Sequence, residues 1–505
     1  MDRDAILVTG GFFATRCLLG AGLLWSELGC GAARSNAPPE RILAAADQQS
    51  SLVASSASES HARAQTTLIT SGPGDYWRSG QATVVTGIRP DLRVEVAFPL
   101  QTWDGFGGTF NEAGWDALGL LSAAERKRAL LLLFDTVQGA GFSYGRIPIG
   151  ASDYAIDRYT LSDRADDYMM ESFSIERDRQ RLLPYVQAAL AINPRLRLWA
   201  SPWTPPAWMK ENHSTDGGRI RDEPKILAAY ALYLARFVEA YRAEGVTVWA
   251  VHPQNEPGYE QTYPTCLWTP ELLTRFIGAY LGPTFATRNV GAEIWLGTLS
   301  APEDTQHVAT ALGNSAASQY IKGIGVQWST LPAVPGFVSS YGLPVMQTEH
   351  RCGNYPWVKS FDASRPQNDH AYGEETWDLI ASWIRAGVNA YVAWNMVLDD
   401  VGRNLDAQRP WPQNALLVVD RVSHTLNVTP AYYVFRHLSQ FVQARAQRLD
   451  TSGKEDALAF ENPDGSIVTV IHNPGDAART VTLELRATEL QLEVPGHGWA
   501  TLGWR

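Results

Sequence analysis

The sequence contains few cysteines and little positive charge. Its 505 residues include four cysteines, Cys17, Cys30, Cys266 and Cys352. So few and so scattered, they exclude a disulfide scaffold and a zinc site, and we expect Cys266 and Cys352 to be buried free thiols. The formal net charge of −11 argues against a nucleic-acid partner or an anionic membrane surface. An uncharged substrate fits this composition better.

Long apolar runs are also scarce. Beyond the first 35 residues, no apolar stretch reaches the roughly eighteen residues that span a bilayer, so we expect no stable membrane insertion. Residues 1–35 resemble a weak secretory leader, with an apolar run over residues 12–25. We therefore expect a secreted or periplasmic protein, with a loosely matching lipid-attachment box that ends at Cys30. Residues 36–66, rich in Ala, Ser and Gln, predict a flexible linker.

Short apolar segments alternate with amphipathic helices through the middle of the chain. The helices include residues 123–137 and 225–244. Eight segments are typical of buried parallel strands: residues 103–108, 142–149, 196–201, 246–252, 293–299, 323–328, 344–349 and 388–395. Eight is the number that a closed (β/α)₈ barrel requires, so we predict a TIM barrel over residues 101–430.

The pattern changes towards the C-terminus. After a predicted helix at 432–441, polar and apolar residues alternate and are interrupted by Asn-Pro turns, which predicts strands at 457–461, 466–472, 480–485 and 499–504. We assign residues 431–505 to an all-β sandwich. Segment 67–100 contains two further predicted strands, 81–85 and 92–98, which have no partner in a barrel. We expect them to complete the same sandwich.

Two glutamates follow predicted barrel strands. Glu256 lies in Asn255-Glu256-Pro257, and Glu349 lies 93 positions later. A barrel unit takes roughly thirty residues, so about three units separate the two glutamates and their strands lie on roughly opposite sides. Two facing carboxyls at the barrel mouth are what glycoside hydrolysis needs, one as proton donor and one as nucleophile.

Residues around the two glutamates suit the same chemistry. The amide of Asn255 can bond the 2-hydroxyl of a sugar, and Arg146 at a strand end can hold a carboxylate in its ionised form. Most of the 18 tryptophans stand in strand-end or loop contexts. Core packing is expected for about half of them, and the alternative is a cleft whose rings stack on sugars. Asp399 and Asp400 lack further ligands at suitable spacing, so no metal site is expected.

Six motifs carry a family resemblance. They are Asp104–Gly108, Arg146–Pro148, Ala200–Lys210, Gln254–Pro257, Thr348–Glu349 and Trp394–Asp399. In this order they resemble glycoside hydrolase family thirty of clan A, which includes glucosylceramidases and endo-β-1,6-glucanases. The resemblance covers roughly residues 103–505. It implies a (β/α)₈ barrel with a β-sandwich, hydrolysis with retention of configuration, and no metal or cofactor.

The resemblance also implies roles for individual residues. Glu256 matches the acid/base and Glu349 the nucleophile. Glu112 stands where glucosylceramidases have an aspartate that binds sugar hydroxyls. The remaining matches are expected to contact substrate: Trp203 and Trp394 as aromatic walls, Tyr263 near the nucleophile, Trp328, and Asn414 as a polar loop residue.

Departures from the pattern leave the sugar open. Glucosylceramidases carry His-Trp-Tyr where this chain has Gln327-Trp328-Ser329. Gln327 could donate to a sugar hydroxyl or could be a buried structural amide. Changes in residues that contact the sugar shift preference between sugars by roughly 1–3 kcal/mol. The leading interpretation is a retaining β-glycosidase for β-linked glucose, or a related sugar, in a glycan or glycolipid.

Two alternatives remain at this point. An endo-xylanase or endo-β-1,6-galactanase of the same clan would share the two carboxylates. A xylanase that recognises glucuronate would need a basic cluster, for which Arg403 and Arg409 are candidates. A non-catalytic glycan-binding barrel would have lost at least one carboxylate, and both are present.

Overall fold

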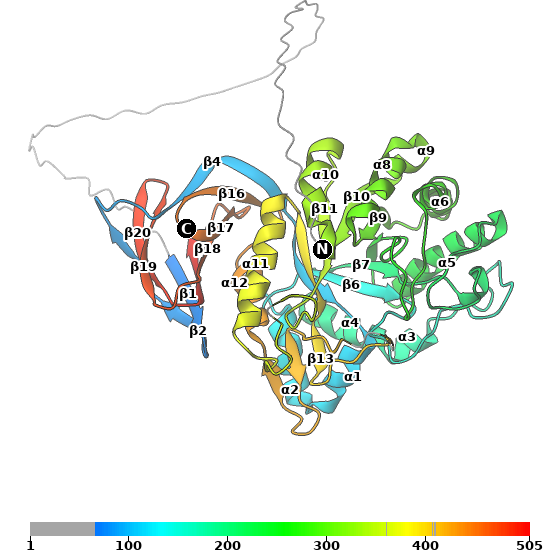
Figure 1. Cartoon of the computed structure of the whole chain (residues 1–505), viewed down its shortest axis with the longest axis horizontal. Helices are drawn as coiled ribbons and strands as arrows, with labels where there is room; N and C mark the ends of the chain where they lie inside the picture. The colour runs from blue at the N-terminus through cyan, green and yellow to red at the C-terminus, as the bar shows by residue number, and fades with distance from the viewer. Residues whose placement is uncertain (1–65, 360, 407, 409–410) are drawn as a thin grey trace, which may run out of the picture. The chain divides into compact units, whose positions relative to one another are not determined.

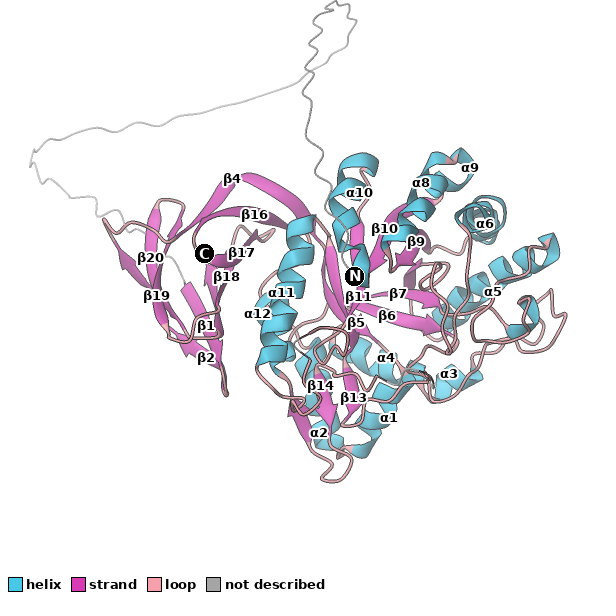
Figure 2. Cartoon of the chain, viewed as in Figure 1, coloured by secondary structure: helices cyan, strands magenta, loops and turns pink. Residues whose placement is uncertain are grey.

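The computed structural model describes residues 66–505, except 360, 407 and 409–410. The predicted leader, with Cys17 and Cys30, lies outside the described residues, as does the linker up to residue 65. Within the described chain, a closed parallel barrel is joined to a separate all-β domain (Figures 1 and 2). None of the described helices is long and apolar enough to cross a membrane.

The predicted (β/α)₈ barrel is confirmed. Its strands are β5 (Gly105–Thr109), β6 (Tyr144–Ile149), β7 (Arg197–Pro202), β8 (Val248–Val251), β9 (Glu293–Leu299), β10 (Ile321–Gln327), β11 (Val345–His350) and β12 (Ala390–Asn395). Each overlaps one predicted segment. Parallel pairing of β12 with β5 closes the barrel. Aromatic and aliphatic side chains, among them Trp199, Trp295 and Met346, fill its interior, so the barrel is a packed core.

Helices follow the strands and cover the barrel. They are α1 (Glu112–Leu120), α2 (Ala123–Phe134), α3 (Glu176–Gln180), α4 (Leu182–Ile192), α5 (Pro224–Ala243), α6 (Pro270–Phe276), α7 (Gly282–Arg288), α8 (Thr305–Gly313), α9 (Ser315–Ser318), α10 (Val334–Tyr341), α11 (Ala371–Ala386) and α12 (Pro430–Ser439). Short helical turns are η1 (Ala207–Met209), η2 (Ile277–Leu281), η3 (Pro302–Asp304) and η4 (Trp328–Ala333). Local signals set the helix ends: the Ser122 side chain accepts from Glu125 N at the start of α2, and Gly387 ends α11 at φ 109°.

Strands from both ends of the described chain form the β-sandwich. They are β1 (Thr66–Gly72), β2 (Asp75–Gly80), β3 (Thr83–Val85), β4 (Leu92–Trp103), β16 (Ala446–Gly453), β17 (Asp456–Glu461), β18 (Ile467–Asn473), β19 (Arg479–Leu485), β20 (Thr488–Val494) and β21 (Gly498–Trp504). The long β4 pairs with β16 and β19, and β1 pairs with β21. The prediction that N-terminal strands complete this domain is therefore confirmed, although β1, β2, β16 and β20 were not among the predicted strands.

Helix α12 lies at the junction of the two domains. Its Tyr432, Phe435 and Leu438 belong to a core that also contains barrel residues and the sandwich residues Phe460, Val468 and Trp499. Phe435 meets Phe106 of β5 edge to face at 6.4 Å. Helix α12 therefore packs with both domains, and the boundary at residue 431 stays a prediction. Before α12, the strands β13 (Val397–Asp399), β14 (Leu417–Val419) and β15 (Leu426–Val428) form a small separate sheet.

Candidate active site

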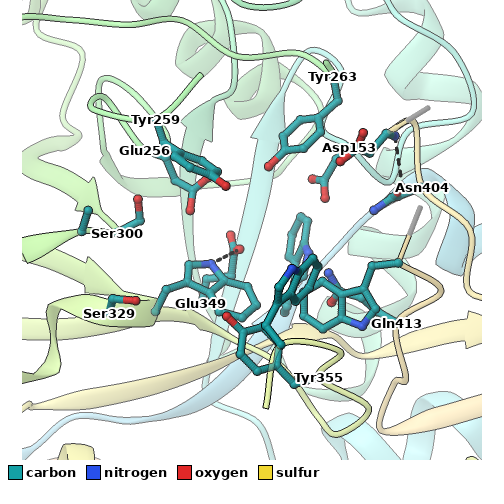
Figure 3. Close-up of a pocket in the computed structure, with 16 residues that line it drawn as sticks. Asp153, Glu256, Tyr259, Tyr263, Ser300, Ser329, Glu349, Tyr355, Asn404 and Gln413 are labelled. Atoms are coloured by element: carbon teal, nitrogen blue, oxygen red, sulfur yellow. Dashed lines mark hydrogen bonds between the residues drawn. The ribbon is translucent and has the colours of Figure 1, made fainter. Parts of the chain in front are cut away.

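A cavity of about 360 Å³ opens where the barrel strands end (Figure 3). Active sites of TIM barrels lie at this face, because the loops that follow the strands converge there. The lining residues come from six of the eight strands or the loops that follow them: Asp153, Glu256, Tyr259, Tyr263, Ser300, Ala301, Trp328, Ser329, Glu349, Tyr355, Trp357, Trp394, Asn404, Asp406, Trp411 and Gln413. Both predicted catalytic glutamates are among them.

Glu349 is the penultimate residue of β11 and is held from two sides. The fully buried Arg146 forms an ion pair with its Oε2, and Trp328 Nε1 donates to its Oε1 over 2.9 Å. Burial raises the pKa of Glu349, while the Arg146 charge and the Trp328 donor oppose this rise. The contacts fix the orientation of the carboxylate and favour its ionised form, as a nucleophile requires.

Arg146 links Glu349 to neighbouring strands. Its guanidinium also donates to Asn255 Oδ1 over 2.6 Å and to Ser201 Oγ over 2.9 Å. The same group lies 4.3 Å from the ring centroid of Trp203. One buried cation thus positions the proposed nucleophile and the residue before the proposed acid.

Glu256 lies in the loop after β8 with an unusual backbone. Its φ of 47° is in the left-handed region, which costs a non-glycine residue of order 1–3 kcal/mol, and such residues cluster at functional sites. The backbone N–H of Glu256 donates to Thr298 O over 2.9 Å, which holds the turn. Burial first, and then the charge of Glu349, raise the pKa of Glu256 to about 8. Glu256 is therefore protonated at neutral pH, as a general acid must be.

Gln327 contacts Glu256 rather than the cavity. Its Nε2 donates to Glu256 Oε1 over 3.1 Å, and its Oε1 accepts from Thr348 Oγ1 over 2.9 Å. Of the two interpretations of Gln327 from the sequence, the structure favours the buried amide, because both ends of the side chain are bonded to protein. Asn255 Oδ1 accepts from Arg146 and from Thr298 Oγ1 at 2.8 Å, so any bond from Asn255 to a sugar hydroxyl falls to its NH₂ group.

Four aromatic residues were predicted to contact substrate, and three of them line the cavity. These are Tyr263, Trp328 and Trp394. Trp203 is only 1% exposed and lies behind Trp394, with the ring centroids 5.5 Å apart and the planes 17° from parallel. Trp203 therefore packs against the ring of Trp394 outside the cavity lining, and its direct contact with substrate stays a prediction.

Glu112 and Asn414 also lie away from the cavity lining. Glu112 begins α1 and uses both carboxylate oxygens on protein: Arg177 donates to both over 2.8 Å, and the Ile156 N–H donates to one of them over 2.8 Å. The side chain of Asn414 donates to Gln367 O over 2.8 Å, while its neighbour Gln413 lines the cavity. The structure thus gives no free group on Glu112 for a sugar hydroxyl.

Asp153 lines the cavity and was missed in the sequence. In Figure 3, Asp153 and Asn404 lie on one side of the two glutamates, and Ser300 and Ser329 on the other. Asp153 is 5% exposed, and its Oδ1 has no hydrogen-bond partner. Burial and the nearby glutamates raise its pKa well above the usual range. A buried carboxyl oxygen without a partner beside a cavity suits a ligand hydroxyl. Its position four residues after β6 was the available signal.

Other reactive groups lie outside the cavity lining. Cys266 and Cys352 are free and buried, and burial raises the pKa of each thiol to about 12. Among the described residues, one group offers ligand atoms close enough for a metal ion: Asp378, Asp456 and His472. Asp456 is already paired there with Arg385, so the group carries its own counter-charge.

Comparisons with known proteins agree with this geometry. Residues 103–442 match the glycosyl hydrolase family 30 TIM-barrel domain, and residues 446–502 match the family 30 β-sandwich domain. The chain is 27% identical over 447 residues to lysosomal acid glucosylceramidase of Mus musculus, covering 83% of this chain and 84% of that protein. It is 25% identical over 412 residues to an endo-1,6-β-D-glucanase of Neurospora crassa, covering 77% and 82%.

Solved structures share this fold. The crystal structure of SrfJ from Salmonella typhimurium superimposes with a TM-score of 0.78 at 25% identity, covering 87% of this chain and 100% of that one. The endo-β-1,6-glucanase BT3312 gives 0.77 at 25% identity, covering 87% and 99%. With both domains matched and both strand-end glutamates in one cavity, this chain is a glycoside hydrolase that belongs to glycosyl hydrolase family 30.

Proposed function

We propose that this protein is a retaining β-glycosidase in which Glu349 is the nucleophile and Glu256 the acid/base. The observation that carries the assignment is the contrast between their surroundings. Glu349 is paired with Arg146, whereas Glu256 has a pKa raised to about 8 and receives a neutral amide donor. These surroundings favour an ionised Glu349 and a protonated Glu256. Such a difference in protonation between two neighbouring carboxyls identifies the nucleophile and the acid.

The proposed reaction proceeds by two displacements. Glu349 attacks the anomeric carbon while Glu256 gives its proton to the departing glycosidic oxygen. Ester formation removes the charge of Glu349, which is the second largest cause of the raised pKa of Glu256. The pKa of Glu256 therefore falls in the glycosyl-enzyme, and Glu256 can take a proton from the water that attacks the same carbon. Two inversions restore the β configuration.

The glycone is proposed to be a neutral β-linked glucose. Four carboxyl groups line the cavity, which disfavours an anionic sugar: those of Asp153, Glu256, Glu349 and Asp406. Trp394 offers a ring face, and Asp153 an unpartnered oxygen, to the hydroxyl-bearing ring. The two relatives compared above carry names that refer to glucose-containing substrates. A glucan is the leading substrate class, and a glucosylated sphingolipid is the second candidate because of the 27% identity to a glucosylceramidase.

Azide rescue tests the assignment of the two glutamates. Glu349→Gln should abolish turnover, whereas Glu256→Ala should still form the glycosyl-enzyme from an activated nitrophenyl β-glucoside. Added azide should then yield the β-glucosyl azide, because a small anion needs no general base. An α-azide from Glu256→Ala would reverse the roles. Equal rates on the β-xyloside or β-galactoside would contradict glucose as the preferred glycone.

Export is proposed from the leader-like segment 1–35. The test is to express the full chain with a C-terminal tag and to sequence the N-terminus of the recovered protein. Cleavage within residues 25–35 would support export, and a lipid on Cys30, detected by mass spectrometry, would support anchoring. An uncleaved chain starting at Met1 would contradict both.

A further inference from the structure

A large aromatic side chain stands exposed at the mouth of the catalytic cavity. Trp357, in the loop after β11, is 56% exposed although it lines the cavity. Exposure falls along the rings that lead inward, to 9% at Trp411 and 1% at Trp394. Placing an indole in water is unfavourable unless a ligand or partner covers it, so a ring in this position indicates a contact surface.

Neighbouring rings hold Trp357 in place. It meets Trp411 edge to face, with centroids 5.1 Å apart and an interplanar angle of 86°, and lies 5.2 Å from Tyr355. Tyr355 stacks on Trp328 at 6.2 Å, and Trp328 donates to Glu349. Arg351 supports the Tyr355 ring from 4.2 Å. A continuous row of aromatic rings therefore runs from the nucleophile to the mouth.

The cavity is closed behind Trp394, so the part of the substrate beyond the glycone must lie along this row of rings. Behind Trp394 lies Trp203, itself buried, so a sugar bound at Glu349 cannot extend in that direction. Any part of the substrate outside the glycone must pass the mouth, where Trp357 and the 39% exposed Tyr259 lie.

The chemistry of the lining distinguishes a sugar from an alkyl chain. Aromatic and polar residues make up almost all of the described lining, and Ala301 is its single aliphatic member. The CH-rich face of a pyranose stacks on aromatic rings while its hydroxyl groups bond polar neighbours, such as Ser300 and Ser329. An alkyl chain would instead need a continuous aliphatic groove.

We infer that Trp357, supported by Tyr355 and Trp411, is the stacking platform of a second sugar-binding subsite, so that the substrate is an oligosaccharide or polysaccharide of at least two rings. This inference rests on the proposed function for the position of the first ring. Trp357 would favour substrates of two or more rings, whereas the two glutamates act on the first ring alone.

Comparing substrates of different length tests the inference. β-Glucosyl fluoride reports on the first ring alone, whereas a β-1,6-linked glucotriose also reports on the second. For Trp357→Ala, the ratio of kcat/KM for the trisaccharide to that for the fluoride should fall about tenfold, as expected for the loss of one aromatic contact. Trp357→Phe should recover most of the ratio. Phe98→Ala, at a 75% exposed position on β4, is the matched control and should leave the ratio unchanged.

Other outcomes would overturn the inference. These are an unchanged ratio in Trp357→Ala, or a loss confined to detergent-dispersed glucosylceramide, which would make the surface a lipid contact. Calorimetric binding of the trisaccharide to Glu349→Gln protein, with and without Trp357→Ala, requires no turnover. If the parent enzyme hydrolyses neither sugar, the proposed function fails. Weaker binding of the trisaccharide to the Glu349→Gln, Trp357→Ala double variant than to Glu349→Gln alone would still support the subsite. Equal binding to the two proteins would overturn it.

Discussion

Gln327 donates through Nε2 to Oε1 of Glu256 over 3.1 Å. The hydroxyl of Thr348 donates to the other end of the same amide, so the NH₂ group faces Glu256. Because Oε1 of Glu256 accepts this bond, Oε2 is the oxygen left to carry the proton of the neutral acid. An amide does not titrate in the working pH range, so this contact orients the acid at every pH.

Removing the amide donor should move the basic limb of the pH profile. The Gln327 bond lowers the pKa of Glu256, so Gln327→Leu should raise that pKa and shift the fall in activity to higher pH. The value of kcat should drop about tenfold, because the ionised Glu256 needed in the second step loses a stabilising donor. Thr348→Val, which frees the amide to rotate, should show a smaller shift in the same direction. A basic limb that stays in place in Gln327→Leu would contradict this role.

The parent enzyme should have a bell-shaped dependence of kcat/KM on pH. Activity should rise as Glu349 ionises, and because burial raises its pKa, this limb lies above the usual carboxyl range. Activity should fall as Glu256 loses its proton, near pH 8. The two groups titrate as a coupled pair, so both limbs report on the pair. With an activated aryl glucoside, Glu256→Ala should lose only the basic limb, and persistence of that limb would assign the acid to another group.

Asp153→Asn should damage catalysis without harming the fold. The Asp153 carboxyl is buried beside the cavity with one oxygen unpartnered, so its hydrogen bond awaits a substrate hydroxyl. Burial raises the pKa of this carboxyl, so it acts as a neutral group, and a hydrogen bond of that kind contributes about 0.5–1.5 kcal/mol. The value of kcat/KM should therefore fall roughly 2- to 10-fold. The Tm should not fall, because the amide replaces a neutral carboxyl of the same size. A lowered Tm with normal kcat/KM would make Asp153 a structural residue.

Replacing Glu112 should lower the stability of the fold and leave catalysis unchanged. Glu112→Ala leaves Arg177 without its carboxylate partner, and loss of one member of a buried pair costs about 3 kcal/mol, with Arg177 partly exposed. Urea unfolding should show this loss, while kcat/KM per folded molecule stays at the parent value. Arg181→Ala, which breaks the more exposed pair with Asp116, is the control and should change stability little. A selective loss of kcat/KM in Glu112→Ala would return Glu112 to the substrate site.

The barrel could be predicted because its strands are buried on both faces and therefore stand out as apolar runs. The run that became β8 ends four residues before Asn255, which already placed Glu256 at the catalytic face. Strand β2 carried no comparable signal: Asp75–Gly80 is an exposed edge strand without alternation. Its partner β1 also pairs with β21, a contact between residues more than four hundred positions apart, so no local pattern indicates the sheet that β2 joins.

The sequence predicts which residues follow barrel strands, but it does not predict which of their side chains face the cavity. Glu112 and Asp153 both follow barrel strands, so a position after a strand does not by itself distinguish them. Arg177, 65 positions away from Glu112, decides between them by engaging both oxygens of Glu112. Likewise, Trp203 and Trp394 both end strands, and only their packing order, with Trp394 lining the cavity, distinguishes them.

The pairing of early and late strands imposes an order on biosynthesis. When β12 leaves the ribosome, β5 can close the barrel, but β1 and β4 still lack β21, β16 and β19. Strand β4 gains β16 and β19 first, whereas the edge of β1 that pairs with β21 stays open until residues 498–504 have been translated. That edge can pair with other chains during the interval. For this enzyme, translation speed over the last sixty residues and the supply of chaperones should govern yield more than the barrel itself does.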